Sequence, residues 1–393
     1  MDSEKELIEA TGNYGGLDVE FKTVDDTGPS SAITQKTSDI LEACKWRDAT
    51  RLRSLAESDG GFLSDTLRQT AWPILLGLPS PTLDEKNSEA HPATEDYTAS
   101  DGNWRDFPRH RDEDQVQLDV NRSFIYYPND QSDAEIDKRK QELSRLITEV
   151  LRRNPYLCYF QGYHDICQVF LLVLQPETRA RMVARLSVLR IRDFMLPSLG
   201  PTTAQLRLLP DVLAQADPEL REHIAGIEPY YALAGTLTMY SHNIEGYHDI
   251  ARIFDVILAH EPVFSIYMFA QIVIDRRDEI LEIDEHDMLQ VILGRVPSRM
   301  DLDALIKKAV DLFERHPQKL YDIGTLEDGH RYFEKQASEV HWQELRDRMK
   351  MMVWAYRRSA GVIGMAVAVG VIAVCVRRNP TTLQSILNFF SKW

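Results

Sequence analysis

Two short motifs about forty residues apart hold the side chains of this chain that are best suited to chemistry. The first motif runs Val116-Gln117-Leu118-Asp119-Val120-Asn121-Arg122, and the second runs Tyr159-Phe160-Gln161-Gly162. An arginine can neutralise the charge that develops on a phosphoryl group during transfer, and a glutamine can orient the attacking water. Arg122 and Gln161 are therefore the candidate catalytic residues.

Each of these residues also has an ordinary structural interpretation. An arginine three positions after an aspartate is often a surface residue or an ion-pair partner of that aspartate, because positions i and i+3 are neighbours on a helix. A lone glutamine often caps or bridges helices. It is the combination of Arg122 with Gln161 that favours catalysis.

Composition excludes several classes of protein. The chain has 393 residues, of which 44% are hydrophobic, so it can form one large domain or two ordinary ones with a buried core. The formal net charge of −16 argues against nucleic-acid binding, which depends on basic patches. The four cysteines are scattered and form no Cys-x-x-Cys pair, which indicates neither a disulfide framework nor zinc and favours a reducing, cytosolic environment.

Two polar stretches interrupt the chain. Residues 1–38 are acidic and rich in turn residues, and we expect them to be a disordered tail. Residues 80–114 hold ten acidic against four basic side chains, a net charge of −6, and are expected to be an acidic, solvated insertion in a domain that spans residues 39–320. Because this insertion directly precedes the arginine motif, the possibility that it borders a binding surface stays open.

The rest of the domain has the pattern of successive helices. Residues 134–153 place apolar side chains at helical spacing after a capping-box sequence, Ser132 to Glu135. Residues 302–313 repeat this pattern, with Asp301 as the expected N-cap. No convincing run of alternating strands and no repeat is present in the sequence, so the expected fold class is all-α, a multi-helix array.

A purely apolar segment, residues 359–376, lies near the end of the sequence. No charge interrupts its 18 residues, which as a helix would span about 27 Å. That length matches the thin hydrocarbon core of the endoplasmic reticulum, and arginine pairs bracket the segment on both sides, at 357–358 and 377–378. We therefore expect a single transmembrane helix; a buried core helix is the alternative.

The surroundings of this segment suggest an orientation. The acidic, polar N-terminus does not resemble a signal peptide, and only 17 residues follow the apolar run. We expect a helical juxtamembrane region at 321–358, the membrane span, a short tail at 377–393, and a cytosolic domain held by its C-terminal anchor. Whether Cys375, at the membrane edge, carries a lipid is left open by the sequence.

The two catalytic motifs resemble those of the TBC-domain family, the GTPase-activating proteins for Rab GTPases. The family pattern runs apolar-x-x-Asp-x-x-Arg, then Tyr-x-Gln-Gly, and it is preceded by Arg-x-x-x-Trp. The residues of this chain that match are Arg68, Trp72, Val116, Asp119, Arg122, Tyr159, Gln161 and Gly162, with Asp165 following. Each motif is weak alone, but their shared order is specific, and the resemblance covers about residues 65–300.

The resemblance implies a multi-helix TBC-type array and a mechanism with two fingers. Arg122 would be the arginine finger and Gln161 the glutamine finger, both entering the nucleotide site of a GTP-bound Rab. The chain would need no metal, cofactor or nucleotide site of its own, because the Rab carries GTP and Mg²⁺. The sequence agrees with this, since it has no Gly-x-x-x-x-Gly-Lys-Ser/Thr loop.

Six further residues are expected to support the fingers: Asp119, Tyr159, Gly162, Asp165, Arg68 and Trp72. The two aspartates would hold the fingers by hydrogen bonds, and Tyr159 and Trp72 would pack. Gly162 would permit close approach of the GTPase backbone or of a helix. Arg68 would form a buried pair with Asp119 or Asp165.

A TBC domain followed by a near-terminal membrane span resembles the anchored subfamily of animal member twenty and its fungal counterparts. This implies a single-pass protein of the endoplasmic reticulum or early Golgi membrane that acts on the Rab of ER-to-Golgi transport. Two alternatives stay open. The domain could bind a Rab as a scaffold or tether without accelerating hydrolysis, or the helical array could be an adaptor unrelated to GTPases.

Overall fold

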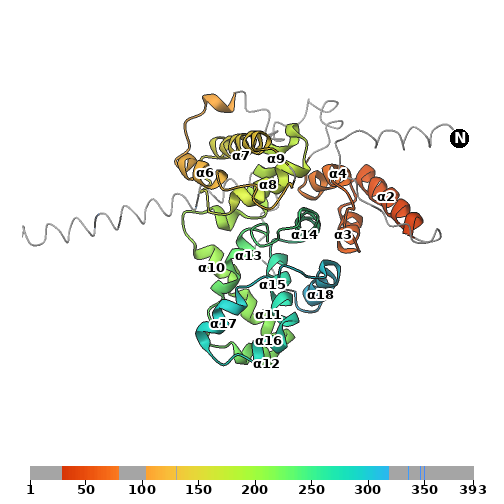
Figure 1. The fold of residues 1–393 in the computed structure, drawn as a ribbon, viewed down its shortest axis with the longest axis vertical. Coiled ribbons are helices and arrows are strands. Elements are labelled where there is room, and N and C mark those ends of the chain that lie inside the picture. Colours follow the sequence, from red (N-terminus) through yellow and green to blue (C-terminus); the bar gives the residue numbers. More distant parts are fainter. Residues whose placement is uncertain are drawn as a thin grey trace, which may run out of the picture.

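The computed structural model of the protein describes residues 29–78, 103–129 and 131–317, with the single positions 335, 346 and 349. Within these ranges every regular element is a helix and no strand is present, which confirms the all-α class expected from the sequence. Figure 1 shows the helices as an elongated array, with the first half of the domain above the second.

The first half of the domain packs around α8. Its elements are α2 (Pro29–Trp46), α3 (Ala49–Glu57), α4 (Asp65–Leu75), η1 (Trp104–Asp106), α6 (Glu113–Val120), α7 (Asp133–Arg153), α8 (Tyr163–Val173), α9 (Pro176–Leu189) and η2 (Arg192–Met195). α7 contacts α6, α8 and α9, and α4 also contacts α8. The two candidate finger residues follow α6 and precede α8, respectively.

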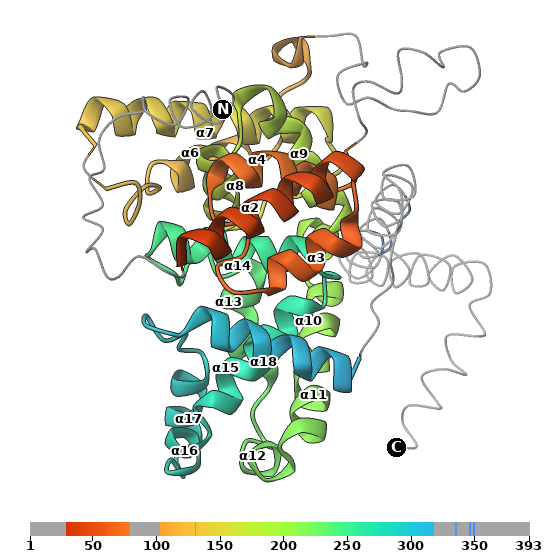
Figure 2. The ribbon, with the colours of Figure 1, turned by 90° about the vertical axis from the view of Figure 1, so that its right-hand side faces the viewer.

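The second half is built on α15. Its elements are α10 (Gly200–Leu206), α11 (Leu208–Ala216), α12 (Pro218–His223), η3 (Pro229–Ala232), α13 (Leu233–Leu237), α14 (Tyr247–Ala259), α15 (Phe264–Asp275), α16 (Arg277–Leu281), α17 (His286–Leu293) and α18 (Leu302–Arg315). α14 joins the halves, because it contacts α3 and α4 of the first half and α18 of the second. In Figure 2 it lies below α4 and above α18.

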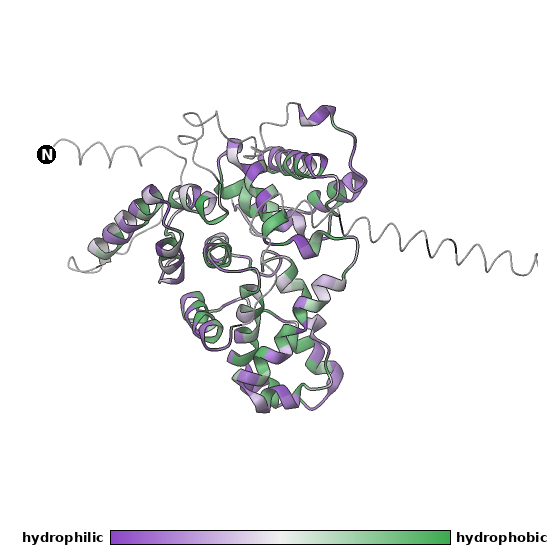
Figure 3. Ribbon diagram, turned by 180° about the vertical axis from the view of Figure 1, so that it is seen from behind, coloured by the Kyte–Doolittle hydropathy of each residue, from purple (hydrophilic) through white to green (hydrophobic). Residues whose placement is uncertain are grey.

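The core runs through the central helices. Every residue from Ile250 to Ala259 in α14 and from Phe264 to Val273 in α15 is buried. A helix that is covered on all faces belongs at the centre of a bundle, whereas the outer helices alternate between apolar and polar faces. Figure 3 shows this alternation as green and purple on opposite sides of the outer ribbons.

Helix boundaries predicted from capping signals are confirmed. α7 begins at Asp133, and Ser132 and Glu135 form the expected reciprocal capping box. α18 begins at Leu302, where the Asp301 side chain accepts a hydrogen bond from the backbone N–H of Ala304 at 3.0 Å. Both caps satisfy backbone donors that the first helical turn leaves without partners.

The predicted disordered tail is wrong in its boundary. α2 begins at Pro29, so residues 29–38 are helical. Proline is favoured at a first helical position because its φ angle is already helical. Lys36 also donates to the backbone carbonyl of Ser58, which fixes this turn of α2 to the segment after α3. Residues 1–28 lie outside the described residues.

The end of the predicted acidic insertion is also ordered. Residues 103–114 form η1 and the start of α6, and they pack on α7. The Arg152 guanidinium lies 5.7 Å from the Trp104 ring centroid and donates to both carboxylate oxygens of Glu113 at 2.7 and 2.9 Å. These paired contacts explain why this part of the stretch is not a solvated loop. Residues 79–102 lie outside the described residues.

The predicted transmembrane segment, residues 359–376, lies outside the described residues, as does the tail at 377–393. Of the predicted juxtamembrane region, only the three single positions are described. Among the helices that are described, none combines the length and the apolar character needed to cross a membrane.

Candidate functional site

Arg122 lies in the turn that ends α6. Its backbone N–H donates to the carbonyl of Asp119 at 3.0 Å, and its Nη2 donates to Asp119 Oδ1. The Arg122 side chain is 61% exposed, whereas the Asp119 carboxylate is 0% exposed. The guanidinium is therefore tethered through Nη2 while most of the side chain is exposed to solvent. The ion pair expected for a structural arginine and the exposure expected for a finger occur together.

Asp119 is the centre of the hydrogen bonds around the arginine. Besides Arg122, it accepts from the Tyr159 hydroxyl at 2.9 Å and from Gln115 Nε2 at 3.1 Å. Burial alone would raise the pKa of Asp119, but the hydrogen bonds from Tyr159, Arg122 and Gln115 outweigh it and hold that pKa below its ordinary value. Burial and the nearby charge of Asp119 raise the pKa of Tyr159, so Tyr159 keeps its proton and donates.

Tyr159 connects this centre to the glutamine. Its backbone N–H donates to Asp112 Oδ2 at 2.9 Å, and Gln161 follows two residues later with an exposed side chain. Nearby, His110 Nε2 lies 3.0 Å from the carbonyl of Leu157. The ordered end of the acidic stretch thus fixes the segment that carries the glutamine, and a single buried carboxylate contacts both finger segments.

Gly162 is required by backbone geometry. It is the N-cap of α8 with φ of 102°, a conformation that side-chain-bearing residues rarely adopt. A Cβ at this position would lie 2.6 Å from Thr238 Cγ2. The close approach expected of Gly162 is therefore made to the segment after α13 of the same chain.

Asp165 contacts histidines, and neither finger is among its described contacts. It accepts from His242 Nδ1 at 3.2 Å, and His164 Nε2 lies 3.2 Å from its other oxygen. The hydrogen bond to Asp165 raises the pKa of His242, whereas burial lowers the pKa of His164. The support expected from Asp165 is therefore indirect: His164, which contacts Asp165, has its Nδ1 3.2 Å from the Tyr159 hydroxyl. Whether this support acts on the fingers stays a prediction.

The Arg68 and Trp72 motif belongs to a second cluster. Arg68 donates through Nε and Nη2 to both oxygens of Asp255 at 3.0 Å, and through Nη1 to Asp65 at 3.0 Å. The Arg68 side chain is 4% exposed. Trp72 packs against two phenylalanines, as expected, but its Nε1 also donates to Asp255 at 2.8 Å. The predicted pairing of Arg68 with Asp119 or Asp165 is wrong, because α4 packs on α14, which carries Asp255.

Sequence reasoning missed two buried residues that shape these clusters. Gln168 is the one polar side chain between Ile166 and Val173 of α8, and Asp255 is surrounded by apolar residues in α14. A buried polar group needs a partner, so an isolated polar residue in an apolar helix is the signal that could have identified both.

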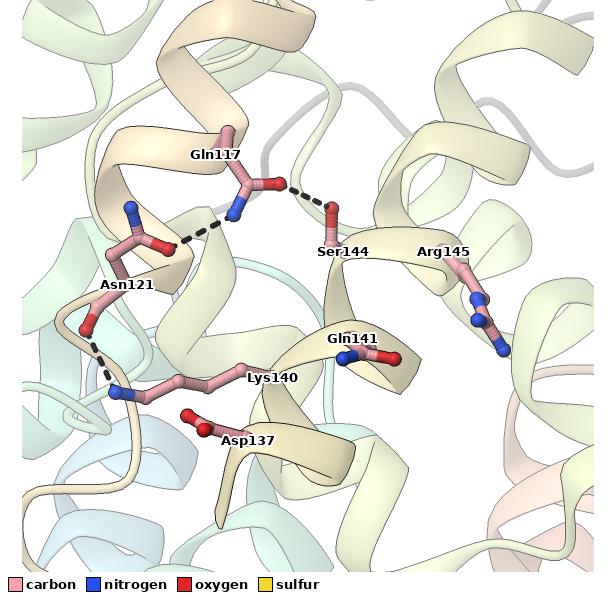
Figure 4. Close-up of a pocket in the computed structure, with 7 residues that line it drawn as sticks. All are labelled: Gln117, Asn121, Asp137, Lys140, Gln141, Ser144 and Arg145. Carbon is pink, nitrogen blue, oxygen red and sulfur yellow. Dashed lines mark hydrogen bonds between the residues drawn. The ribbon is translucent and has the colours of Figure 1, made fainter. Parts of the chain in front are cut away.

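A polar groove of about 370 Å³ lies between α6 and α7, as Figure 4 shows. Within it Lys140 Nζ donates to the carbonyl of Asn121 at 2.9 Å, and Gln117 Nε2 donates to Asn121 Oδ1 at 2.9 Å. Ser144 in turn donates to Gln117 Oε1 at 3.2 Å. A lysine on the terminal carbonyls stabilises a helix end, so these contacts fix the C-terminus of α6 immediately before Arg122.

The site presents its reactive groups outward. An exposed guanidinium and an exposed amide stand on a buried hydrogen-bonded base, so both are available to a molecule that docks on this face. Among the described residues, no group of three or more His, Cys, Asp or Glu side chains is arranged to hold a metal ion. The geometry suits side chains that act in another molecule's site.

Known proteins are similar to this chain in sequence and in fold. The sequence profile of the Rab-GTPase-TBC domain matches residues 65–281, which include both candidate fingers and Asp255. Similar in fold is the crystal structure of the Ypt/Rab-GAP domain of Gyp1p, with a TM-score of 0.54 and 18% identity over 72% of this chain and 99% of that one.

Two relatives are similar in sequence. "TBC1 domain family member 20" of Bos taurus is 34% identical over 289 residues, which is 72% of this chain and 68% of the relative. "GTPase-activating protein gyp10" of Schizosaccharomyces pombe is 31% identical over 70% of this chain and 71% of the relative. The chain thus spans about two thirds of the length of such relatives. The chain belongs to the Rab-GTPase-TBC domain family.

Proposed function

We propose that this protein is a GTPase-activating protein for a Rab of early secretory, ER-to-Golgi traffic. Arg122 and Gln161 enter the nucleotide site of the GTP-bound Rab as arginine and glutamine fingers. The observation that carries the proposal is the buried Asp119 carboxylate, which bonds the exposed Arg122 and, through Tyr159, the segment of Gln161. Family membership and the names of the relatives support it.

Each finger has one chemical task. Arg122 stabilises charge between the leaving and the transferring phosphoryl groups, for which its permanent charge and planar donor fork are suited. Gln161 positions the attacking water. An arginine finger supplied in trans accelerates Ras by about 10³–10⁵, which corresponds to roughly 4–7 kcal/mol of barrier. The Rab brings GTP and Mg²⁺, so this chain supplies no cofactor.

Single-turnover GTP hydrolysis tests the proposal. The full chain in detergent micelles is mixed with a panel of Rab GTPases loaded with GTP. We expect the wild type to accelerate GTP hydrolysis by at least one Rab. The accelerated rate should fall by about 10³-fold in Arg122→Ala and should be strongly reduced in Gln161→Ala. Arg315→Ala is the matched control, because Arg315 is an equally exposed arginine paired with Asp311 at the end of α18. Full activity of either finger variant would remove the assigned role.

A Rab-binding scaffold is the alternative, and the same panel separates the two. A scaffold binds GTP-loaded Rab but leaves the rate of hydrolysis unchanged, whereas an activator shortens the lifetime of bound GTP. The exposure of both finger side chains on one tethered base favours the activator, since a scaffold needs neither.

The apolar residues 359–376 anchor the domain to the endoplasmic reticulum membrane in this proposal, with the helical domain in the cytosol. Its support is the sequence: 18 uncharged residues between two arginine pairs. Deletion of residues 357–393 should move the protein from the membrane to the soluble fraction. Restoring an unrelated apolar segment of equal length should return it. Membrane association of the deletion variant would contradict the anchor.

A further inference from the structure

In the loop after Arg122, two neighbouring exposed residues lie between two buried ones. Phe124 and Tyr127 are buried, whereas Ile125 and Tyr126 between them are 74% and 43% exposed. We call Ile125 and Tyr126 the apolar tip. Large apolar side chains with this exposure need an explanation when they flank a functional group rather than standing singly on the surface.

Gln168 of α8 holds this loop from inside. Its Oε1 accepts from the backbone N–H of Phe124 at 3.0 Å, and its Nε2 donates to the carbonyl of Tyr127 at 3.2 Å. One buried amide therefore bonds both backbone positions that bracket the apolar tip. Removing it would leave two backbone groups without partners in a buried setting.

The backbone of the loop is held in an uncommon conformation. Phe124 has φ of 63°, which is disfavoured for a bulky residue and persists where the surroundings determine it. The surroundings here are the buried rings of Phe124 and Tyr127 and the Gln168 amide. The apolar tip is consequently presented outward on a rigid loop, which reduces the ordering cost of binding.

The position of the tip points to its partner. Ile125 lies three residues after Arg122, and Leu118, 60% exposed on α6, lies four residues before it. If Arg122 enters the nucleotide site of a GTPase, residues this near along the chain meet the GTPase surface beside that site. A few residues near the centre of an interface contribute most of its binding energy, and tyrosine is enriched among them, while apolar neighbours exclude water from the contact.

We propose that Ile125 and Tyr126, with Leu118, contact an apolar surface of the GTP-bound Rab beside its nucleotide, and that Gln168 is the positioning residue for this contact. The inference rests on the proposed function and adds the recognition surface to it. Arg122 supplies chemistry, while the apolar tip supplies affinity and sets the depth to which the arginine enters.

Steady-state GTP hydrolysis by a Rab, with the full chain in detergent micelles, tests the tip. We expect Ile125→Ser/Tyr126→Ser to raise the KM for GTP-loaded Rab about tenfold or more and to leave kcat within about threefold. Leu41→Ser is the control: Leu41 is also exposed, but on α2, on the opposite side of the domain from α6 in Figure 1. Both substitutions are at exposed positions, so folding is retained. Unchanged KM in the double variant would overturn the proposal.

A double-mutant cycle tests Gln168. We expect Gln168→Leu to raise KM in the wild-type background and to add little in the Ile125→Ser/Tyr126→Ser background, because both changes act through one surface. A purely structural role would give effects that add. Additive effects on KM would therefore remove Gln168 from the proposal while leaving the apolar tip in place.

Binding separates this inference from the proposed function. If the wild-type protein accelerates no Rab, the proposed function fails, and the tip is judged by binding to Rabs loaded with a non-hydrolysable GTP analogue. Loss of binding in the double variant supports the tip; equal binding, or no binding by the wild type, overturns it. A change in self-association or in vesicle binding without a change in Rab affinity would assign the tip to a second copy or to lipid, and would also overturn it.

Discussion

Two clusters in this domain use the same residue types for different ends. The finger cluster consists of Asp119, Arg122 and Tyr159, and the core cluster consists of Asp255, Arg68 and Trp72. In each, a fully buried aspartate accepts hydrogen bonds from an arginine and from an aromatic side chain. They differ in the arginine, which is largely exposed in the finger cluster and buried in the core cluster.

That difference changes what each carboxylate does. Asp255 accepts hydrogen bonds from Nε and Nη2 of Arg68 and so joins α4 to α14. Its charge is therefore compensated inside the fold. Asp119 takes one nitrogen of Arg122 and leaves the remaining donors for a partner. A motif containing an arginine and an aspartate therefore does not by itself mark a catalytic residue. Burial of the guanidinium separates the structural pair from the pair for which we propose a function.

The largest expected effect is on stability in the core cluster. Arg68→Met leaves the buried Asp255 charge without its partner and should lower the free energy of unfolding by about 3–5 kcal/mol. Arg122→Met should lower it by less than about 1 kcal/mol, because Arg122 is exposed and Asp119 keeps its bonds from Tyr159 and Gln115. Urea unfolding followed by circular dichroism measures both.

The effects of these two variants on the acceleration of GTP hydrolysis should have the opposite order. Arg122→Met should lose the acceleration of GTP hydrolysis while remaining folded, and any activity lost in Arg68→Met should follow the folded fraction. Equal losses of stability in the two variants would show that the finger arginine is also a structural residue, and the comparison would then fail.

The aromatic donors give the second comparison. Tyr159→Phe and Trp72→Phe each remove a hydrogen bond to a buried carboxylate, which should cost about 1.5–3 kcal/mol of stability, with more for Trp72 because the smaller ring leaves a cavity. Only Tyr159→Phe should lower kcat in the folded protein, because Tyr159 links the segment of Gln161 to Asp119, the carboxylate that also bonds Arg122. Thermal unfolding and kcat at saturating Rab are the measurements.

A fall in kcat per folded molecule for Trp72→Phe would contradict the division between the clusters. An unchanged kcat for Tyr159→Phe would mean that Asp119 alone orients the arginine, and it would restrict the tyrosine to packing.

The sequence predicted the finger cluster better than the core cluster, and the reason is distance along the chain. Asp119 and Arg122 are three residues apart, so helical spacing brings them together without knowledge of the fold. Arg68 and Asp255 meet only when α4 packs on α14, 187 positions apart. Amphipathic spacing identifies the buried face of a helix but not the helix that covers it, which is why the partner predicted for Arg68 was wrong.

The acidic stretch before the fingers shows a second limit. Its charge count predicted a solvated loop, yet residues 103–114 are ordered because Arg152 of α7 pairs with Glu113 and stacks near Trp104. Net charge averages over a segment, whereas order depends on whether individual charges find partners. The helix caps at Ser132 and Asp301 were predictable because each cap uses only neighbours in sequence.

Two glycines give a third, smaller comparison. A Cβ at Gly162 would lie 2.6 Å from Thr238 Cγ2, and a Cβ at Gly61 would lie 2.5 Å from Asp255 Oδ2. Both glycines have positive φ angles, so alanine at either position should cost about 1–3 kcal/mol. Gly162→Ala should in addition lower kcat, because its neighbour is Gln161, whereas Gly61→Ala should lower stability alone.

Thr238→Ser supplies a rescue that only Gly162→Ala should show. Serine lacks the Cγ2 methyl group and retains the hydroxyl that donates to the carbonyl of Ala234. We expect part of the lost kcat to return in the Gly162→Ala/Thr238→Ser protein, with the remaining loss due to backbone strain. No recovery would show that the methyl contact does not determine where the glutamine lies.

The smallest expected effect is a pH dependence that the core cluster, which has no histidine among its three residues, does not share. His242 is held near Asp165, and this hydrogen bond raises its pKa above the ordinary value of 6.5. Folding therefore favours the protonated form of His242. Its contribution is present in full below pH 6.5 and is lost as the pH rises through the folded-state pKa.

Comparison of the wild type with His242→Gln isolates this contribution. The difference in the free energy of unfolding should be largest below pH 6.5 and should disappear at alkaline pH. Burial lowers the pKa of His164, so that residue gives the opposite slope in both proteins. The positive charge of His242 adds a smaller lowering, which His242→Gln removes, so this coupling is part of the measured difference. A difference independent of pH would show that His242 supports Asp165 by contact alone.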